Sequence, residues 1–360
     1  MAKLEKSTLA LTFKFDCDRF LRFRLASDVE RDALGVSDET YKRPGIDLIQ
    51  AAGRRWEADK YQDLIDTSEV GKVVFLLENK VDDLLGREPF KKIQNLFDIL
   101  RQQDPPQTII EAEFTVPTNI TPGLQKAYDD FGLEQVRVRP DILWIRPGGT
   151  GAPLIGNGSV PEYEIHIIDV KMAAEPSLRH FTEVTYYALA LATAIEQEGL
   201  SGRYAVSAEG AIWPGNHDIN AFRNLVQLYQ AKGGQDPVSG ALCETLIRVP
   251  YEVYEVHVKQ FFEDRLLRVL QTAMEDASWH VGPKCQLCDY VRYCREKASE
   301  CDHLSRLAWL NQGQAELLRS NGITTTADLT EAVTTADDRW LSVIDSSHQL
   351  RADGPALATR

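Results

Sequence analysis

The chain has 360 residues, of which 43% are hydrophobic, and its formal net charge is −14. This size allows one large core with a small appendage, and no apolar run is long enough to span a membrane, so a membrane partner is not expected. The acidic balance argues against nucleic-acid binding through a general positive field, so any such contact must come from local basic groups. No apolar leader precedes the chain, which predicts a cytoplasmic protein without structural disulfides.

The predicted elements run from helices to a sheet and back to helices. Residues 1–45 form an irregular or helical segment, followed by a helix around Glu57 and a helical stretch over Asp82–Leu100. Strands are predicted at Thr108–Val116, Val136–Ile145, Tyr163–Lys171 and Arg203–Trp213, with a further candidate at Val73–Leu77. A helix over Leu178–Ala194 would connect the third of these strands to the fourth. That crossover predicts an α/β fold whose sheet is at least partly parallel.

The strand that ends in Ile-Ile-Asp-Val-Lys carries the most informative pair of side chains. Residues two apart on a strand point to the same face, so Asp169 and Lys171 are expected to project together. A carboxylate can bind a hard cation such as Mg²⁺, and the ammonium can orient water or offset phosphate charge. The alternative for this tripeptide alone is a surface ion pair.

Two other carboxylates could complete a cation site. Asp141 follows Pro140 at the bend of the strand written VRVRPDILWI, and Glu57 lies in a helix with apolar residues at helical spacing. Glu113 on a neighbouring strand could also face the site or face away. Buried carboxylates need a partner or a metal, so three of them with one lysine predict divalent-cation binding. For Glu57 alone, the alternative is a solvated helix residue.

The order of these motifs resembles the RecB-like branch of the PD-(D/E)XK nuclease superfamily. The matching residues are Gly53-x-x-x-Glu57, Asp141, Asp169-x-Lys171 and Glu183-x-x-x-Tyr187. The resemblance implies a restriction-endonuclease-like mixed sheet flanked by helices, with a small C-terminal helical extension. It also implies that Glu57, Asp141 and Asp169 bind Mg²⁺ or Mn²⁺ and that Lys171 assists hydrolysis.

The same resemblance assigns Glu183 and Tyr187 to contact with the nucleic-acid strand. Glu183 stands where this family usually has glutamine, which removes an amide donor and adds negative charge near a phosphate. Alternatively, the two side chains, one helical turn apart, stabilise the helix or its packing.

Six cysteines are present, and three of them lie close together as Cys285, Cys288 and Cys294. Cys-x-x-Cys spacing lets one loop place two thiolates on one metal centre, which predicts metal or cluster binding. If Cys301 supplies the fourth thiolate, the site is local and suits zinc. If Cys17 supplies it, the pattern is similar to that of iron-sulfur RecB-like nucleases, including the CRISPR adaptation and AddB families, and implies a structural 4Fe-4S cluster. Cys243 is expected to be a small buried hydrophobe.

The chain beyond Cys301 resembles a degenerate helix-hairpin-helix unit. Two short amphipathic helices are predicted on either side of an Asn-Gly pair, while Trp309 and Asn311 stand where that motif carries glycines. Their bulk would obstruct close approach of the backbone to phosphate, which favours a packing or partner role. The expected division is a nuclease domain at 1–300, the degenerate motif at 301–336 and a polar tail at 337–360.

Together these features predict an Mg²⁺- or Mn²⁺-dependent deoxyribonuclease acting on DNA with single-stranded ends or flaps, in DNA repair, CRISPR adaptation or antiviral defence. No Walker-type loop is present, so a helicase motor would have to be another subunit. The alternatives are a catalytically silent subunit that binds DNA ends and a zinc-stabilised regulatory protein. Basic clusters that could contact a strand are Arg19–Arg24, Arg54 with Arg55, Lys91 with Lys92, and Arg292 with Arg295.

Overall fold

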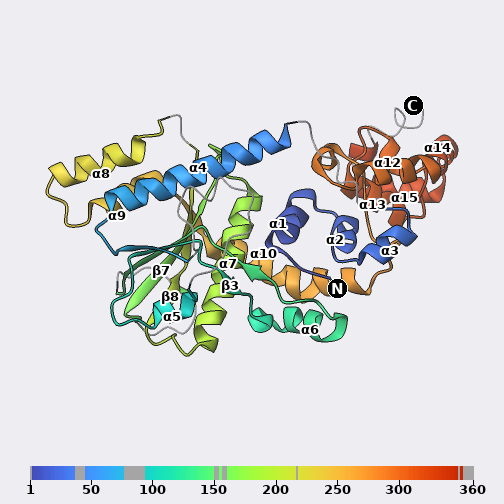
Figure 1. Ribbon diagram of the computed structural model, residues 1–360. Helices are drawn as coiled ribbons and strands as arrows, with labels where there is room; N and C mark the ends of the chain where they lie inside the picture. The colour runs from blue at the N-terminus through green and yellow to red at the C-terminus, as the bar shows by residue number, and fades with distance from the viewer. Residues whose placement is uncertain are drawn as a thin grey trace. The chain divides into compact units, whose positions relative to one another are not determined.

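The computed structural model describes residues 2–36, 45–76, 94–149, 154–155, 160–215, 218–347 and 349–351 (Figure 1). The chain forms two compact units, Met1–Phe13 with Arg43–Gln271 and Lys14–Lys42 with Thr272–Arg360. They are called here the sheet unit and the cysteine unit. The expected domain at 1–300 is divided between these units, because Lys14–Lys42 and residues 272–300 belong with the C-terminal part of the chain. Among the described residues, none of the helices has the length and hydrophobicity needed to cross a membrane.

The sheet unit is a mixed α/β structure. Its described α-helices are α4 (Ile46–Thr67), α5 (Leu96–Leu100), α6 (Pro122–Phe131), α7 (Leu178–Gln197), α8 (Ala221–Ala231), α9 (Pro237–Thr245), α10 (Tyr251–Gln260) and α11 (Leu266–Gln271), and α1 (Lys6–Phe15) begins in it. Its described strands are β1 (Val73–Phe75), β2 (Thr108–Ile110), β3 (Phe114–Thr115), β4 (Arg137–Val138), β5 (Ile142–Pro147), β6 (Leu154–Ile155), β7 (Tyr163–Val170), β8 (Tyr204–Ser207), β9 (Glu209–Trp213) and β10 (Ile247–Pro250). Most of the predicted helix at Asp82–Leu100 lies outside the described residues, as do Leu77, Lys91 and Lys92.

Eight of these strands form one mixed sheet in the order β1-β2-β5-β7-β8-β6, with β9 beside β7 and β10 beside β9. Strands β2, β5 and β7 run antiparallel to one another in turn, whereas β8 and β9 run parallel to β7. The parallel pairing follows from the α7 crossover. The predicted mixed sheet flanked by helices is therefore confirmed.

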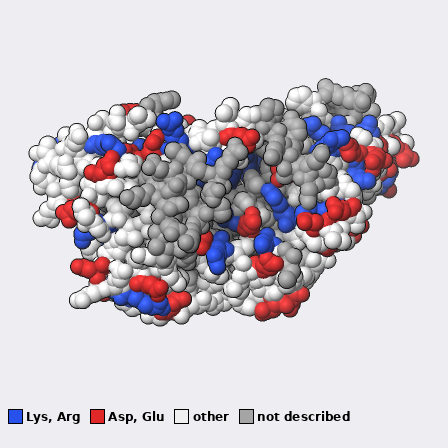
Figure 2. Space-filling view, viewed as in Figure 1, with Lys and Arg blue, Asp and Glu red and all other residues white. Residues whose placement is uncertain are grey.

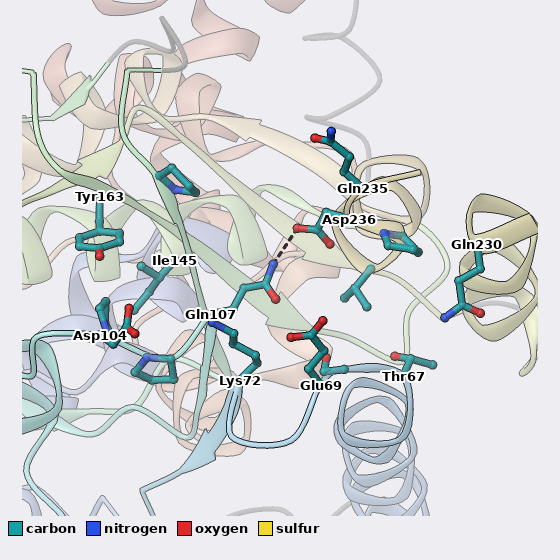
Figure 3. A pocket seen from close by; sticks show the side chains of 16 residues that line it. Thr67, Glu69, Lys72, Asp104, Gln107, Ile145, Tyr163, Gln230, Gln235 and Asp236 are labelled. Carbon is teal, nitrogen blue, oxygen red and sulfur yellow. Dashed lines mark hydrogen bonds between the residues drawn. The ribbon is translucent and has the colours of Figure 1, made fainter. Parts of the chain in front are cut away.

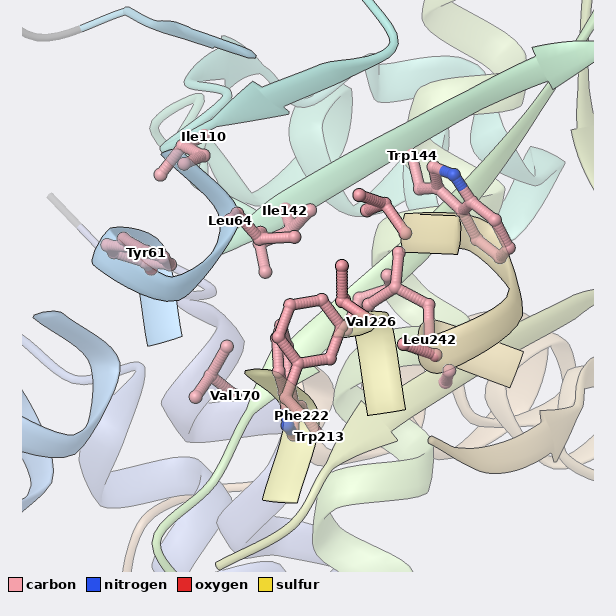
Figure 4. Close-up of a cluster of buried hydrophobic side chains, with 14 of the residues drawn as sticks. Tyr61, Leu64, Ile110, Ile142, Trp144, Val170, Trp213, Phe222, Val226 and Leu242 are labelled. Carbon is pink, nitrogen blue, oxygen red and sulfur yellow. The ribbon is translucent and has the colours of Figure 1, made fainter. Parts of the chain in front are cut away.

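A hydrophobic core fills one face of the sheet (Figure 4). Ile168 and Val170 of β7 belong to it, together with Tyr61 of α4, Phe222 of α8 and Leu242 of α9. Each fully buried side chain of this kind contributes about 1.5 to 3 kcal/mol to folding. Because side chains alternate along a strand, the residue between Ile168 and Val170 projects to the other face, which α7 covers.

Two predicted strands are interrupted at the same place. Glu111 ends β2 in a left-handed conformation with φ 57°, and its N–H donates to the Asp141 carbonyl at 2.9 Å. The chain then continues as β3, which pairs with β4 in a separate two-stranded sheet. Pro140, between β4 and β5, has no N–H to donate to a ladder. The interruption brings two acidic residues, Glu111 and Asp141, side by side.

In the cysteine unit, α2 (Asp18–Arg24) and α3 (Asp28–Ala33) pack with the C-terminal part of the chain. The Arg19 N–H donates to the Ser278 carbonyl at 3.0 Å, and Arg22 Nε donates to the Thr272 carbonyl at 2.9 Å. Arg24 Nη2 lies 2.9 Å from Asp289 Oδ2. These arginines bind groups within their own unit, which gives them a structural role, and the interpretation of this cluster as a nucleic-acid contact stays a prediction.

The remaining described elements of the cysteine unit are short helices: a 3-10 turn at Pro283–Leu287, α12 (Val291–Glu300), a 3-10 turn at Leu304–Arg306, α13 (Gln312–Ser320), α14 (Thr326–Thr335) and α15 (Asp338–Ser346). Gly322, with φ 77°, forms the predicted turn between α13 and α14. Asn311 caps α13 by accepting from the Gln314 N–H, whereas Trp309 is 74% exposed. The expected polar tail instead carries α15, whose Trp340 and Val343 are buried in the same small core.

Candidate active site and cysteine cluster

Two adjacent strands hold the central carboxylates of the sheet unit. Asp141 precedes β5, and its Oδ2 accepts a 2.7 Å hydrogen bond from the Val170 N–H on β7. Asp169 lies one residue before that amide and is 0% exposed. Lys171 Nζ lies 2.6 Å from Asp169 Oδ2, while the Lys171 N–H donates to the Trp213 carbonyl on β9 at 2.9 Å. The predicted pairing of Asp169 with Lys171 on one face is confirmed.

Asp169 lies in an environment that disfavours a charged carboxylate, because it is fully buried and close to other acidic side chains. Among the described residues, the Lys171 ammonium is its ion-pair partner, 2.6 Å from Oδ2, and neither oxygen accepts a further hydrogen bond. Burial raises the pKa of Asp169, and the negative charges of Asp141 and Glu183 add to the rise against the opposing effect of Lys171. A buried carboxylate without donors is costly. Its Oδ1 is therefore available to a bound cation, whereas Oδ2 lies against the Lys171 ammonium.

Glu57 faces this site from α4. Its pKa is raised to about 8 by burial, by Asp141 and further by Glu111 and Asp169, against the opposing effect of Lys171. The interpretation of Glu57 as a fully solvated helix residue is wrong. Tyr61, one turn later, donates a 3.0 Å hydrogen bond to Glu111 Oε1. One face of α4 thus closes the acidic end of the sheet.

Glu111 was not among the predicted site residues. It is 3% exposed, and Arg139 Nε lies 2.5 Å from its Oε2. Burial raises the pKa of Glu111 although Arg139 opposes the shift. Glu113, considered from the sequence, instead forms an ion pair with Arg137 at 3.5 Å. The available signal was a pair of acidic residues, Glu111 and Glu113, inside the apolar run TIIEAEFTV, but alternation could not predict the left-handed turn at Glu111 that separates their environments.

Lys6 is the second side chain that sequence reasoning missed. Its Nζ lies 3.3 Å from Glu183 Oε1 and donates a hydrogen bond to the Tyr187 hydroxyl. Burial raises the pKa of Glu183, but Lys171 and Lys6 outweigh burial and hold the pKa below its usual value. Glu183 is consequently an ionised group with its own counterion. Together with Tyr187 it lies on α7 beside Asp169, as the predicted site requires.

The donor set suits a hard divalent cation. Five carboxylates (Glu57, Glu111, Asp141, Asp169 and Glu183) share the site with three cations (Lys6, Arg139 and Lys171), an excess of two negative charges when all are ionised. In the conformation seen here, however, no three His, Cys, Asp or Glu side chains of the described residues are arranged to hold a metal ion. The suitability of this site for a divalent cation therefore rests on its carboxylate oxygens, which such cations prefer as ligands, and on the buried Asp169 carboxylate, which accepts no hydrogen bond among the described residues.

In metal-free protein, stability is expected to fall as the pH rises from about 5 to about 8. The folded state binds the Glu57 proton more tightly, because its pKa is about 8 instead of the ordinary 4.5. Ionisation in this window therefore favours unfolding, by at most about 1.4 kcal/mol per pH unit. The melting temperature of wild type in EDTA should drop between pH 6 and pH 8, and Glu57→Gln should lessen the drop.

Asp59→Asn is the matched control for that measurement, because Asp59 is an exposed carboxylate on the same helix. It should keep the wild-type pH dependence. An unchanged slope in Glu57→Gln would contradict the placement of Glu57 among buried carboxylates.

Four of the six cysteines are electrostatic neighbours in the cysteine unit. Burial raises the pKa of Cys294 to about 12, with Cys17 and Cys285 adding to the rise against Arg19. The pKa of Cys288 is likewise raised to about 12, by burial and then by Cys294, Cys17 and Cys285. Thiols that raise one another's pKa are protonated until a metal competes for them. The donor type of this group suits a thiolate-bound metal centre, although in this conformation no three cysteines of the described residues are arranged to hold a metal ion.

The two remaining cysteines lie apart from this group. Cys301 is exposed at the end of α12 and is not among the main causes of the pKa shifts of Cys17, Cys288 or Cys294. Cys243 on α9 is also exposed, so the expectation that it is a buried hydrophobe is wrong. The reason is its position on α9, where Ala241 and Leu242 take the core-facing places.

A hollow of about 500 Å³ in the sheet unit lies away from the carboxylates (Figure 3). Tyr163, which lines it, begins β7, whereas Asp169 comes six residues later and about 20 Å further along the strand. Gln107 Nε2 donates to Asp236 Oδ2 at 2.8 Å across part of the hollow. This space is thus not part of the candidate active site.

Other predicted basic clusters have mixed outcomes. Arg292 forms an ion pair with Glu296 at 3.1 Å and stays exposed. Arg55 is exposed on α4, and Arg54 is partly buried there. Acidic and basic side chains are interspersed on the described surface seen in Figure 2. Such a surface agrees with the negative formal charge and leaves strand contact to local groups.

The chain matches no protein-family model, no curated protein and no solved structure. The resemblance to RecB-like nucleases stays a prediction from the sequence.

Proposed function

We propose that this protein is a metal-dependent DNA nuclease of the RecB-like kind, with a restriction-endonuclease-like sheet unit. The observation that carries the proposal is the convergence of Glu57, Asp141, Asp169 and Lys171 at one end of the sheet, with a buried Asp169 whose one close partner among the described residues is the Lys171 ammonium. A purely structural ion pair would not need this surplus of buried carboxylates, because each of them lowers stability.

In the proposed hydrolysis, the acidic side chains bind the metal ion and the basic side chain acts on water or phosphate. Glu57, Asp141 and Asp169 would hold Mg²⁺ or Mn²⁺, which when bound supplies Lewis acidity toward water and phosphate. Lys171 stays protonated, because Asp169, Asp141 and Glu183 raise its pKa despite its burial. It therefore acts as a hydrogen-bond donor and positive charge for water or phosphate and not as a base.

Lys6 and Tyr187 act on the other side of Asp169. Lys6 neutralises Glu183 and so prevents that carboxylate from repelling a phosphodiester. Burial raises the pKa of Tyr187 well above its ordinary value, which keeps the hydroxyl protonated. The pair Lys6 and Glu183 replaces the neutral amide donor that the family resemblance leads one to expect at this position.

For the cysteine unit we infer a structural 4Fe-4S cluster held by Cys17, Cys285, Cys288 and Cys294. Their mutual electrostatic effects support the inclusion of Cys17 over Cys301. Such a cluster would fix the N-terminal segment of this unit to its C-terminal segment, which closes a long loop that chain entropy otherwise disfavours. Zinc is the alternative metal.

The function is tested with end-labelled single-stranded and double-stranded DNA and RNA of one sequence. Protein purified without oxygen, so that a cluster survives, is incubated with Mg²⁺, Mn²⁺ or EDTA. We expect cleavage of DNA with single-stranded ends in either metal and none in EDTA. Protein that retains its cluster and cleaves none of these substrates would overturn the proposal.

A second candidate is a subunit that binds DNA ends without cutting, within a larger helicase-nuclease or defence complex. The observation that favours it is the present arrangement, in which Lys171 and Lys6 lie against Asp169 and Glu183 and no three possible ligands of the described residues hold a metal position. This candidate predicts that the protein binds DNA with equal affinity with and without divalent metal. It also predicts that no cleavage product forms in either condition.

A further inference from the structure

A polar groove opens beside the candidate active site, on the described surface of the sheet unit. It has a volume of about 470 Å³, which is within the usual range for ligand sites, about 300 to 1,000 Å³. One wall is the N-terminal segment with Lys3, Lys6 and Ser7, and the other is the chain leading through β4, with Arg137 and Arg139. The walls are joined by backbone, because the Glu134 N–H donates to the Ala2 carbonyl at 2.9 Å.

Basic side chains are the more exposed members of the ion pairs along this groove. Lys3 is 53% exposed and pairs with Glu134 at 3.1 Å, and Arg137 is 69% exposed and pairs with Glu113 at 3.5 Å. Exposed pairs of this kind contribute only about 0 to 1 kcal/mol. Lys3 and Arg137 can therefore leave their partners for a stronger anion such as a phosphate.

The groove leads directly to the carboxylates. Lys6 lines the groove and also pairs with Glu183 beside Asp169. Arg139 lines it as well and pairs with Glu111, which accepts from Tyr61 on α4. Two basic side chains, Lys6 and Arg139, thus belong both to the groove and to the candidate active site. A strand lying in the groove would therefore pass beside the acidic cluster.

We propose that this groove binds the sugar-phosphate backbone of one nucleic-acid strand, through Lys3, Lys6, Arg137 and Arg139, and leads that strand to the carboxylates. The proposal rests on the proposed function, since it names the path of the substrate of that site. The residues that line the groove include no aromatic side chain, so bases are not stacked there and binding does not depend on sequence.

Binding is measured without cleavage, in EDTA, by fluorescence anisotropy of a labelled thymidine oligonucleotide of about 15 nucleotides. The variant Lys3→Gln/Arg137→Gln removes two groove charges without touching the candidate active site. The control Lys126→Gln/Arg248→Gln removes two exposed charges outside the groove lining. Affinities are taken at several salt concentrations between about 0.05 and 0.3 M.

Each phosphate contact on a single strand contributes about 0.7 to the slope of log affinity against log salt. The groove variant should lower that slope by about 1.4 and weaken binding about tenfold near 0.1 M salt, whereas the control should match wild type. In cleavage assays the same variant should raise KM and leave kcat unchanged.

A groove variant that binds like wild type, or a wild type that does not bind the strand, overturns the groove. The proposed function is contradicted by a different result. If binding depends on the groove but no cleavage occurs in Mn²⁺, the groove proposal is supported and the nuclease proposal is wrong.

Discussion

The Asp169→Asn variant is expected to lose DNA cleavage by about a thousandfold or more while folding at least as stably as wild type. The substitution keeps the shape of a fully buried side chain but removes a charge whose pKa is raised by burial, Asp141 and Glu183. Removal of one electrostatic stabiliser of a transition state commonly costs about 10² to 10³ in rate, and loss of a metal ligand adds to this. Melting temperature in EDTA and initial cleavage rate in Mn²⁺ are the two measurements.

Asp63→Asn is the control that separates charge removal from loss of function. Asp63 is also buried, but it is matched by Lys60 at 2.7 Å and Arg223 at 2.5 Å, away from the site. Breaking these pairs should lower the melting temperature and leave cleavage at a permissive temperature near wild type. Asp169→Asn protein that still cleaves at the wild-type rate would contradict the assignment of Asp169.

The Cys17→Ser variant is expected to lose the metal centre of the cysteine unit. If Cys17 is a cluster ligand, protein purified without oxygen should lose the brown colour and about four iron atoms per chain. Its melting temperature should fall by about 5 °C or more, because metal binding and folding are coupled. Iron content, zinc content and the absorption spectrum are measured on the same samples.

Cys301→Ser is the matched control, since Cys301 is exposed and lies outside the group of mutually interacting thiols. It should keep the metal content and stability of wild type. Zinc in the wild type, lost from Cys301→Ser and retained in Cys17→Ser, would contradict the cluster and favour the local site.

Side-chain alternation was sufficient to predict the core of the site. The run from Tyr163 to Val170 is buried on both faces, so a strand there was predictable, and Asp169 and Lys171 had to share a face. Glu57 could not be assigned by periodicity, because a helix residue near the border of the apolar face can point either way. The environment of Glu57 is set by carboxylates on neighbouring strands. These residues are far from Glu57 in the sequence, so their proximity could not be read from it.

Glu111 and Lys6 could not be predicted for related reasons. The left-handed turn at Glu111 depends on pairing of its N–H with the Asp141 carbonyl, which is a contact between distant parts of the chain. Lys6 comes from the first helix and meets Glu183 across more than 170 residues. The departure at position 183, a glutamate in place of an amide, was visible in the sequence, but the lysine that balances it was not.

In the C-terminal part of the chain, the local turn motif predicted the structure correctly, whereas the helix that depends on tertiary packing was not predicted. The Asn-Gly pair correctly predicted the turn before α14. The segment after residue 337 looked like a polar tail, because α15 buries only one narrow face, through Trp340 and Val343. A short amphipathic helix of this kind is marginal by itself and is stabilised by the core it completes.

The central claim is that the carboxylates of the sheet unit make a metal-dependent nuclease, and metal add-back tests it most directly. Wild type and Asp169→Asn are stripped with EDTA, mixed with end-labelled DNA carrying single-stranded ends, and sampled before and after excess Mn²⁺. The account predicts that wild type is silent in EDTA and cleaves once Mn²⁺ is added, whereas Asp169→Asn stays silent throughout. Equal cleavage by both proteins, or no cleavage by wild type with its metal centre intact, would contradict it.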